Sequence, residues 1–162
     1  MLFEELTDYR ALVMKTLCSD EEIVKLISDQ ENPTVPNRGL MYTQIFPYAY
    51  TPDTTKETKT FVCFRLSVPE VMNKTYKRIN LIFYIFTHQS LIRTQDGLRP
   101  DLIGQAIERL FNGSLDVGLG RVKLVGMDDI SPITDYHGIA IEYSVAEFNR
   151  PSINGDKGGR SS

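Results

Sequence analysis

One stretch in the middle of the chain is apolar on both of the faces that a β-strand presents. It covers residues 79–86 (INLIFYIF), where apolar side chains occupy even as well as odd positions. A strand with one solvated face alternates apolar and polar residues, so both faces of this strand should be covered. A helix of the same chain can cover one face. A domain of this size has few residues left to cover the second face. A neighbouring subunit is therefore a candidate to cover it.

The N-terminal region predicts two helices. Apolar residues recur at three-to-four spacing over residues 2–18, the period of an amphipathic helix. Ser19 and Glu22 form a capping-box pattern, which predicts a second, short helix. It should begin at about Asp20 and end before Pro33, because the residue before a proline avoids the helical conformation.

The clearest helix is predicted to begin at residue 100. Pro100 suits a first helical position, and Asp101 favours the positive N-terminal end of a helix. Asn112 and Gly113 form a C-terminal stop. The apolar stripe along this helix consists of Leu102, Ile103, Ala106, Ile107, Leu110 and Phe111.

Two strands are predicted before this helix. Residues 60–68 alternate between apolar and polar, and Pro69 should end that strand. Residues 77–88 contain the doubly apolar stretch. The two strands pair most simply as an antiparallel hairpin.

Two more strands are predicted after the helix. Residues 118–127 form the first, with Val122 and Leu124 facing inward. Residues 128–136 are expected to be a turn or loop, and residues 137–148 form the last strand. The apolar face of that last strand consists of Ile139, Ile141, Tyr143 and Val145.

Residues 33–59 are interrupted by prolines and rich in tyrosine. This composition predicts an extended segment with a short edge strand at residues 41–46 and an exposed loop at residues 52–59. Tyr48 and Tyr50 lie among the prolines. Such a segment can wrap its own domain or lie along a partner.

Together these elements predict an α+β protein. We expect a single domain over residues 1–149, with the N-terminal helices in residues 1–32 and the sheet and main helix in residues 60–149. The element order is α-β-β-α-β-β. The sheet should be mainly antiparallel, with about four or five strands and helices packed on one face. Residues 150–162, rich in Gly and Ser, predict a flexible tail that is loose or orders only against a partner.

Composition narrows the classes of function. The chain has 162 residues, 41% hydrophobic and 24% charged, with a net charge of −3 and a pI near 5.4. A sequence-independent nucleic-acid binder usually carries a basic surplus, which is missing here. Cys18 and Cys63 suggest two buried thiols rather than a disulfide scaffold. No signal peptide is recognised, and no apolar stretch approaches the roughly 20 residues that a membrane helix needs.

Candidate catalytic groups are few. Asp128, Asp129, Asp135 and His137, with Glu142 on the following strand, could hold a divalent metal for phosphodiester hydrolysis. The same residue types are also common in turns and at the beginnings of strands, and we consider this the better interpretation. No phosphate-binding glycine loop is present, and no cofactor is expected. Five cations, Lys74, Lys77, Arg78, Arg93 and Arg99, could gather on one side of the sheet, as a phosphate contact or as an intersubunit salt-bridge rim.

Residues 98–112 (LRPDLIGQAIERLFN) resemble a segment common in tailed-bacteriophage neck proteins. The order of elements around them is also similar, including the proline-rich link at residues 44–48 (QIFPY). The nearest type is the tail terminator, or tail completion protein. This resemblance implies a hexameric ring that caps the tail tube, stops its polymerisation and joins it to the head connector or adaptor, with DNA passing through the lumen. It implies a virion location after assembly in the host cytoplasm, and no catalytic residues.

Subunit contacts are expected at the second face of the doubly apolar strand and in the tyrosine-rich segment. The candidate interface residues are Ile82, Tyr84, Phe86, Tyr48 and Tyr50. Three other functions stay open at this point: another neck component (head-completion or connector adaptor), a small phage metal-dependent nuclease using Asp128, Asp129, Asp135 and His137, and a monomeric host-directed interaction module.

Overall fold

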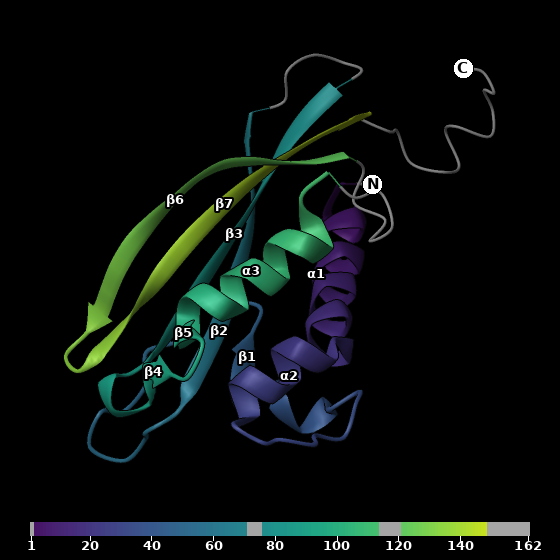
Figure 1. Cartoon of the computed structure of the whole chain (residues 1–162). Coiled ribbons are helices and arrows are strands. Elements are labelled where there is room, and N and C mark those ends of the chain that lie inside the picture. Colours follow the sequence, from purple (N-terminus) through teal and green to yellow (C-terminus); the bar gives the residue numbers. More distant parts are fainter. Residues whose placement is uncertain (1, 71–75, 114–120, 149–162) are drawn as a thin grey trace.

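The computed structural model describes residues 2–70, 76–113 and 121–148, and it has a five-stranded sheet with three helices on one side (Figure 1). The strand order in the sheet is β1-β2-β3-β7-β6. β1 (Ile45–Phe46) runs parallel to β2, and the other neighbouring strands are antiparallel. The predicted α+β class, with a mainly antiparallel sheet covered by helices on one face, is confirmed.

The three helices lie close to their predicted positions. They are α1 (Leu2–Ser19), α2 (Glu21–Ser28) and α3 (Arg99–Phe111). The start of α2 differs in one detail from the prediction. Its N-cap is Asp20 rather than Ser19, because the Asp20 carboxylate accepts a hydrogen bond from the Ile23 amide at 3.1 Å. Asp29, with a left-handed φ of 57°, ends α2 before Pro33, as predicted.

The central hairpin consists of β2 (Thr60–Glu70) and β3 (Tyr76–His88), which pair antiparallel as predicted. Pro69 was predicted to end β2, but the strand continues to Glu70. The register with β3 shifts between Ser67 and Glu70. Such an irregularity is one of the places where a strand tolerates proline, which lacks the N–H of a regular ladder.

The C-terminal hairpin differs most from the prediction. β6 (Arg121–Ile133) and β7 (Tyr136–Phe148) are both 13 residues long, so the expected loop at 128–136 is wrong. Asp135 has a φ of 69° and lies in the tight turn. Asp and Asn tolerate this left-handed conformation better than most residues. The segment before α3 also contains an unexpected small hairpin, β4 (Arg93–Thr94) and β5 (Gly97–Leu98).

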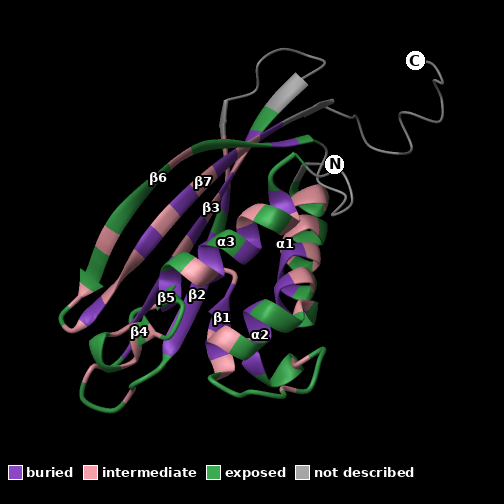
Figure 2. Ribbon diagram, in the orientation of Figure 1, coloured by how far each residue is buried: buried purple, intermediate pink, exposed green. Residues whose placement is uncertain are grey.

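The main core lies between the helices and the inner face of the sheet, which is the face toward α1, α2 and α3 (Figure 2). Phe83 of β3 is at its centre, with its ring centroid 5.1 Å from that of Phe111 and 6.1 Å from that of Tyr143. Gly104 lets α3 approach the sheet closely, because a Cβ there would stand 2.8 Å from Ile139 Cδ1. α3 is thereby seated over β3 and β7.

Candidate assembly surface

The chain itself covers part of the outer face of the sheet, which faces away from the helices. Residues 47–59, called the strap below, follow β1 and lead back to β2 beside an aromatic cluster on that face. Tyr50 of the strap stacks on Phe46 with ring centroids 4.0 Å apart and an interplanar angle of 6°. The buried residues of this second core are Phe46, Phe61, Cys63, Phe86 and Tyr136.

Hydrogen bonds hold the strap closed at Glu57. The Tyr50 hydroxyl donates to the Glu57 carboxylate, with distances of 2.6 and 2.9 Å to its two oxygens. The Tyr136 hydroxyl donates to the Glu57 carbonyl oxygen at 2.6 Å. The hydrogen bond to Glu57 raises the pKa of Tyr50 to about 12. The strap is therefore fixed by ring packing and a few side-chain contacts.

The candidate interface residues fall into different environments. Phe86 is only 2% exposed and packs inside the chain, so no partner reaches it in this fold. Ile82 and Tyr84 are half-buried on the outer face beyond the strap, where Arg65 donates a 3.3 Å hydrogen bond to the Tyr84 hydroxyl. Part of the second apolar face is thus covered by the chain itself, and the remaining part is mixed with polar groups.

The two tyrosines of the proline-rich segment also differ in exposure. Tyr50 is half-buried in the outer cluster, whereas Tyr48 is 49% exposed. Tyr48 lies beside the 60% exposed Tyr42, with ring centroids 6.3 Å apart. Tyr42 has a φ of 63°, an uncommon conformation for a bulky residue. The two rings form a small aromatic surface near β1.

The most exposed apolar side chains of the sheet lie on its edge strand, β6. Leu124 is 41%, Val125 57% and Met127 61% exposed, and β6 is coloured mainly as exposed or intermediate in Figure 2. Leu124 is on the inner face as predicted, because it pairs with the core residue Tyr143, but it is left exposed, whereas Val122 is only 1% exposed. The register with β7 shifts between Leu124 and Gly126, which leaves Val125 without a partner on β7.

The exposure of β6 has a structural cause. Within the sheet α3 packs mainly on β3 and β7, and its C-terminal cap is fixed to the start of β6. The Gly113 amide donates to the Val122 carbonyl at 2.7 Å, and the Leu124 amide donates to Asn112 Oδ1 at 3.1 Å. Beyond these contacts the helix lies over other strands, so the middle of β6 extends past the helical layer.

A hydrogen-bonded group holds this cap in place. The Asn112 side-chain amide donates to Glu108 Oε2 at 2.6 Å, and the buried Tyr143 hydroxyl donates to Glu108 Oε1. Burial is the main cause of a raised Tyr143 pKa, and the bond to Glu108 adds to it. The neutral phenol is therefore strongly favoured in the folded state. Helix α3, β6 and β7 are joined at this point by side chains.

The structure does not bring the candidate metal ligands together. Asp128 pairs with Ala140 and Asp129 with Ile139, so the two neighbouring carboxylates project to opposite faces of β6. Asp135 lies in the turn, and Glu142 accepts a 3.0 Å hydrogen bond from Asn80. Within residues 2–70, 76–113 and 121–148, no group of three His, Cys, Asp or Glu residues is placed to hold a metal ion.

His137 has a different neighbour, Ser131. Its Nδ1 lies 3.1 Å from Ser131 Oγ, beside a cavity of about 360 Å³ between the start of α3 and the end of β6. Asp101 and Asp129 also line this cavity. In the described part of the chain, no hydrogen bond joins His137 to a carboxylate that would orient it for nucleophilic catalysis.

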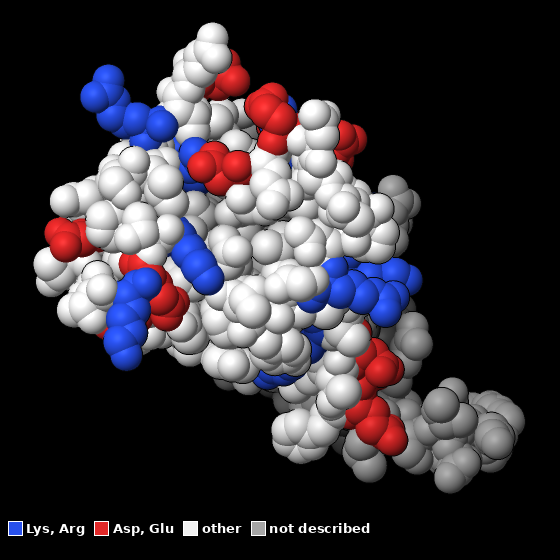
Figure 3. Space-filling model, turned by 90° about the horizontal axis from the view of Figure 1, so that it is seen from below, with Lys and Arg blue, Asp and Glu red and all other residues white. Residues whose placement is uncertain are grey.

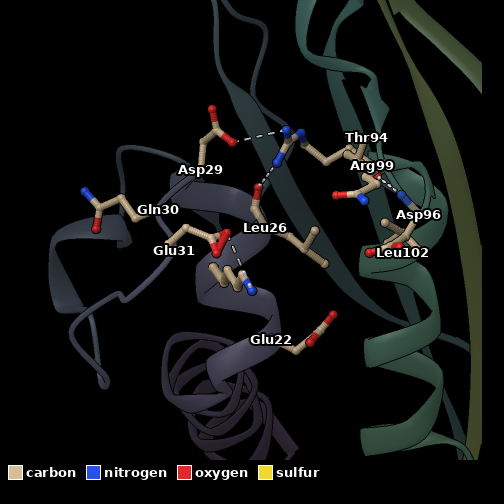
Figure 4. Close-up of a pocket in the computed structure, with 11 residues that line it drawn as sticks. Glu22, Leu26, Asp29, Gln30, Glu31, Thr94, Asp96, Arg99 and Leu102 are labelled. Atoms are coloured by element: carbon tan, nitrogen blue, oxygen red, sulfur yellow. Dashed lines mark hydrogen bonds and ion pairs between the residues drawn. The ribbon is translucent and has the colours of Figure 1, made fainter.

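A second cavity, of about 350 Å³, lies between α2, the β4–β5 hairpin and the start of α3 (Figure 4). Arg99 forms its inner wall and is only 8% exposed. Its guanidinium donates to the carbonyl oxygens of Leu91 and Leu26, both at 2.8 Å, and to Asp29 Oδ1 at 3.2 Å. The contacts to Leu26 and Asp29 link α3 to α2, and the contact to Leu91 links α3 to the turn that precedes the β4–β5 hairpin. Arg99 thus has a structural role and does not join a surface cluster of cations.

Both cysteines are buried and unpaired with each other, as predicted. Burial raises the pKa of Cys18 and of Cys63 to about 11. Such thiols are poor nucleophiles near neutral pH, because the thiolate is the reactive form.

Comparison with known protein families adds one finding. A family model for YomW matches residues 20–145, which is most of the chain. The chain belongs to the YomW family. The matched residues run from the N-cap of α2 into β7 and so include the strap, α3 and the exposed edge of β6. Membership of the phage-derived YomW family suggests a phage protein. No curated protein matches the chain.

The edge of β6 was not predicted as a candidate site from the sequence. A signal was present in the sequence, because Val125, Gly126 and Met127 interrupt the alternation of the strand just before two aspartates. Charged residues and bulges on an edge strand are the means by which proteins control unwanted strand pairing. Read in that way, Asp128 and Asp129 mark an edge strand rather than a loop.

Proposed function

We propose that this YomW-family protein is a structural component of the phage neck, and specifically a tail terminator. In this proposal, copies of the chain form a hexameric ring that caps the tail tube and joins it to the head connector or adaptor. The ring is assembled in the host cytoplasm and retained in the virion. The protein acts by assembly rather than by catalysis.

The observation that carries the proposal is the exposed apolar edge of β6. Leu124, Val125 and Met127 are neighbours in sequence and each is at least 41% exposed. Contiguous exposed apolar residues mark interaction sites more often than isolated ones do. They lie on a strand with one free edge, a surface that forms further contacts when another chain is present.

The charge distribution fits a ring through which DNA passes. The net charge is −3, and acidic and basic side chains are interspersed on the face seen in Figure 3. Such a surface has no strong sequence-independent attraction for DNA, which depends on neutralising phosphates with Lys and Arg. The described residues contain no helix that could cross a membrane.

Measuring tail length tests this function. A phage lacking the gene should make tails of abnormal length that do not join heads, and purified protein added during tube assembly should restore a defined length. A Met127→Asp variant, which places a charge on the exposed edge, should not restore it, whereas Asp53→Asn in the strap should. Normal-length tails in the lysate lacking the protein would contradict the terminator assignment and favour a head-completion or adaptor role.

A further inference from the structure

The sheet has a second edge that is only partly covered. β1 pairs with β2 at Val62 and Cys63, and within the described residues it is the only strand on that side of β2. Residues 64–68 of β2 therefore continue past the end of β1, and no strand of the described part of the chain pairs with their outer edge. The free part of β6, residues 126–131, lies on the opposite side of the same sheet.

Backbone hydrogen bonds show which residues of β6 direct their amide and carbonyl groups away from β7, toward the open edge of the sheet. The Leu124 amide points away from β7, because it donates to Asn112. In a regular strand, every second residue after Leu124 would also direct its backbone groups away from β7. The register shift after Leu124 displaces this pattern by one residue, so that Met127 and Asp129 direct their backbone groups away from β7. The Asp129 amide donates to Asp128 Oδ1 at 3.0 Å rather than to β7, which agrees with this assignment.

The same reasoning applies to β2. The Val62 amide donates to the Gln44 carbonyl at 2.9 Å, on the side of β1. Because backbone groups alternate along a strand, Phe64 and Leu66 also direct their amide and carbonyl groups to this free edge. Arg65, between them, is exposed and its side chain projects from the outer face.

We propose that residues 126–129 of β6 in one copy pair antiparallel with residues 64–67 of β2 in the next copy, so that the sheet continues from subunit to subunit. This inference rests on the proposed ring and identifies the contact that closes it. The partner at the β6 edge is a second copy of this chain.

The directions of the strands suit this contact. β2, β3, β7 and β6 are successively antiparallel, so β6 runs opposite to β2 within one copy. A copy related by rotation about an axis along the strands therefore presents β2 antiparallel to β6 without being inverted. The contact joins two different edges, and such heterologous contacts build closed rings.

The side chains select one register. With Asp128 opposite Arg65, an acidic and a basic residue meet on the outer face. In the same register Met127 lies opposite Leu66 on the inner face, and both residues direct their backbone groups into the new ladder. Opposite charges and apolar pairs on facing strands stabilise a sheet. The contact would cover the exposed Met127 side chain.

The alternative contact between two β6 strands is disfavoured on both halves of the strand. At its beginning, Asn112 and Gly113 already occupy the free edge through Val122 and Leu124. In the remaining part, antiparallel pairing of β6 with itself places Asp128 and Asp129 of both copies close together, and like charges opposite each other destabilise strand pairing.

Disulfide trapping tests the register directly. Facing residues that exchange no backbone hydrogen bonds have Cα atoms about 4.5 Å apart, which lies within the range that a disulfide spans. The double variant Asp128→Cys/Arg65→Cys should form, on mild oxidation, a ladder of covalent multimers that ends at the ring. Cys18 and Cys63 are buried and should stay unreacted.

The matched control is Asp128→Cys/Arg93→Cys, because Arg93 is an exposed arginine on the β4–β5 hairpin. It should give no more than dimers. A double variant Asp128→Cys/Arg65→Cys that forms no more multimer than its single variants would overturn the proposed pairing.

A charge exchange provides an independent test of the pair. Asp128→Arg and Arg65→Asp should each weaken association on the order of threefold to tenfold per contact, and the combined variant should restore it. Failure of the combined variant to recover association would also overturn the register. A ring in the wild-type protein together with failed trapping leaves the proposed function intact, whereas a wild-type protein that never forms a ring, even on tail tubes, contradicts both.

Discussion

The outer face of the sheet and the edge of β6 both carry large apolar side chains, but the chain covers only one of them. Phe61, Phe86 and Tyr136 on the outer face are each at most 2% exposed, because the strap and β1 close over them. Leu124, Val125 and Met127 on β6 stay at least 41% exposed. An apolar sequence pattern therefore predicts that a surface is covered, but it does not predict which part of the molecule, or which partner, covers it.

The first prediction concerns the covered region, where the effect should be largest. Phe86→Ala removes a buried ring from the outer cluster and should lower the free energy of unfolding by about 3–5 kcal/mol, since it leaves a cavity. Chemical denaturation measures this. A loss under 1 kcal/mol would show that the outer cluster does not contribute to stability as its burial indicates.

The second prediction concerns the side-chain contacts that join the end of α3 to β6 and β7, beyond which the middle of β6 is exposed. Tyr143→Phe removes the hydroxyl that donates to Glu108, and it should lower the free energy of unfolding by about 1.5–3 kcal/mol because the acceptor is charged. The same change in a Glu108→Gln background should have a smaller effect. Equal effects in both backgrounds would mean that the two side chains are not coupled.

A third prediction addresses the strap. Tyr50→Phe removes its hydrogen bond to Glu57 and should lower the free energy of unfolding by about 0.5–1.5 kcal/mol, less than Tyr143→Phe, because Tyr50 is only half-buried and water can replace the lost bond. The pKa of Tyr50 is raised from 10 to about 12, so the unfolded chain loses this proton at lower pH than the folded one. Stability from this group is complete below pH 10 and is lost as the pH rises through 12. Tyr50→Phe should therefore flatten the alkaline fall in stability.

Thiol labelling provides a second test of whether the strap shields the outer cluster. Cys63 lies in the outer cluster with Tyr50, whereas Cys18 lies in the last turn of α1, in the main core. Tyr50→Ala should accelerate labelling of Cys63 and leave that of Cys18 unchanged at the same pH. Equal acceleration of both thiols would indicate a global loss of stability rather than opening of the strap.

The smallest effect on stability is predicted at the open edge. Met127→Ser should change the free energy of unfolding by no more than about 0.5 kcal/mol, because the side chain contacts little within one copy. Denaturation under the conditions used for Phe86→Ala makes the two directly comparable. A loss as large as that of Phe86→Ala would mean that Met127 is buried within the subunit in solution, and would remove the contrast between the two regions.

The sequence allowed most of the fold to be predicted, for local reasons. The three-to-four spacing of apolar residues located all three helices, and Pro100 with Asn112 marked the limits of α3 to within a residue. The doubly apolar strand was also correct. Where local rules failed, contacts between strands distant in sequence determined the structure. Pro69 lies within β2, at a shift in the register with β3. Asp128 and Asp129 belong to β6 because β7 pairs with them.

The candidate site was less predictable than the fold. Phe86 and Met127 are both large apolar residues on strands, and their difference in burial depends on the strap and on where α3 lies. Neither can be derived from residue spacing. Ile82, Tyr84, Tyr48 and Tyr50 as interface residues stay a prediction, because a single copy of the chain provides no test of subunit contacts.

The most direct test of the account is the mass of the purified protein in solution, measured by light scattering over a series of concentrations, with and without tail tubes. The account predicts a ring-sized mass for the wild-type protein, formed alone at high concentration or on the tube, and a folded monomer for Met127→Asp. A wild-type protein that stays a monomer at every concentration, and that leaves tail tubes uncapped, would contradict the claim that β6 is an assembly surface.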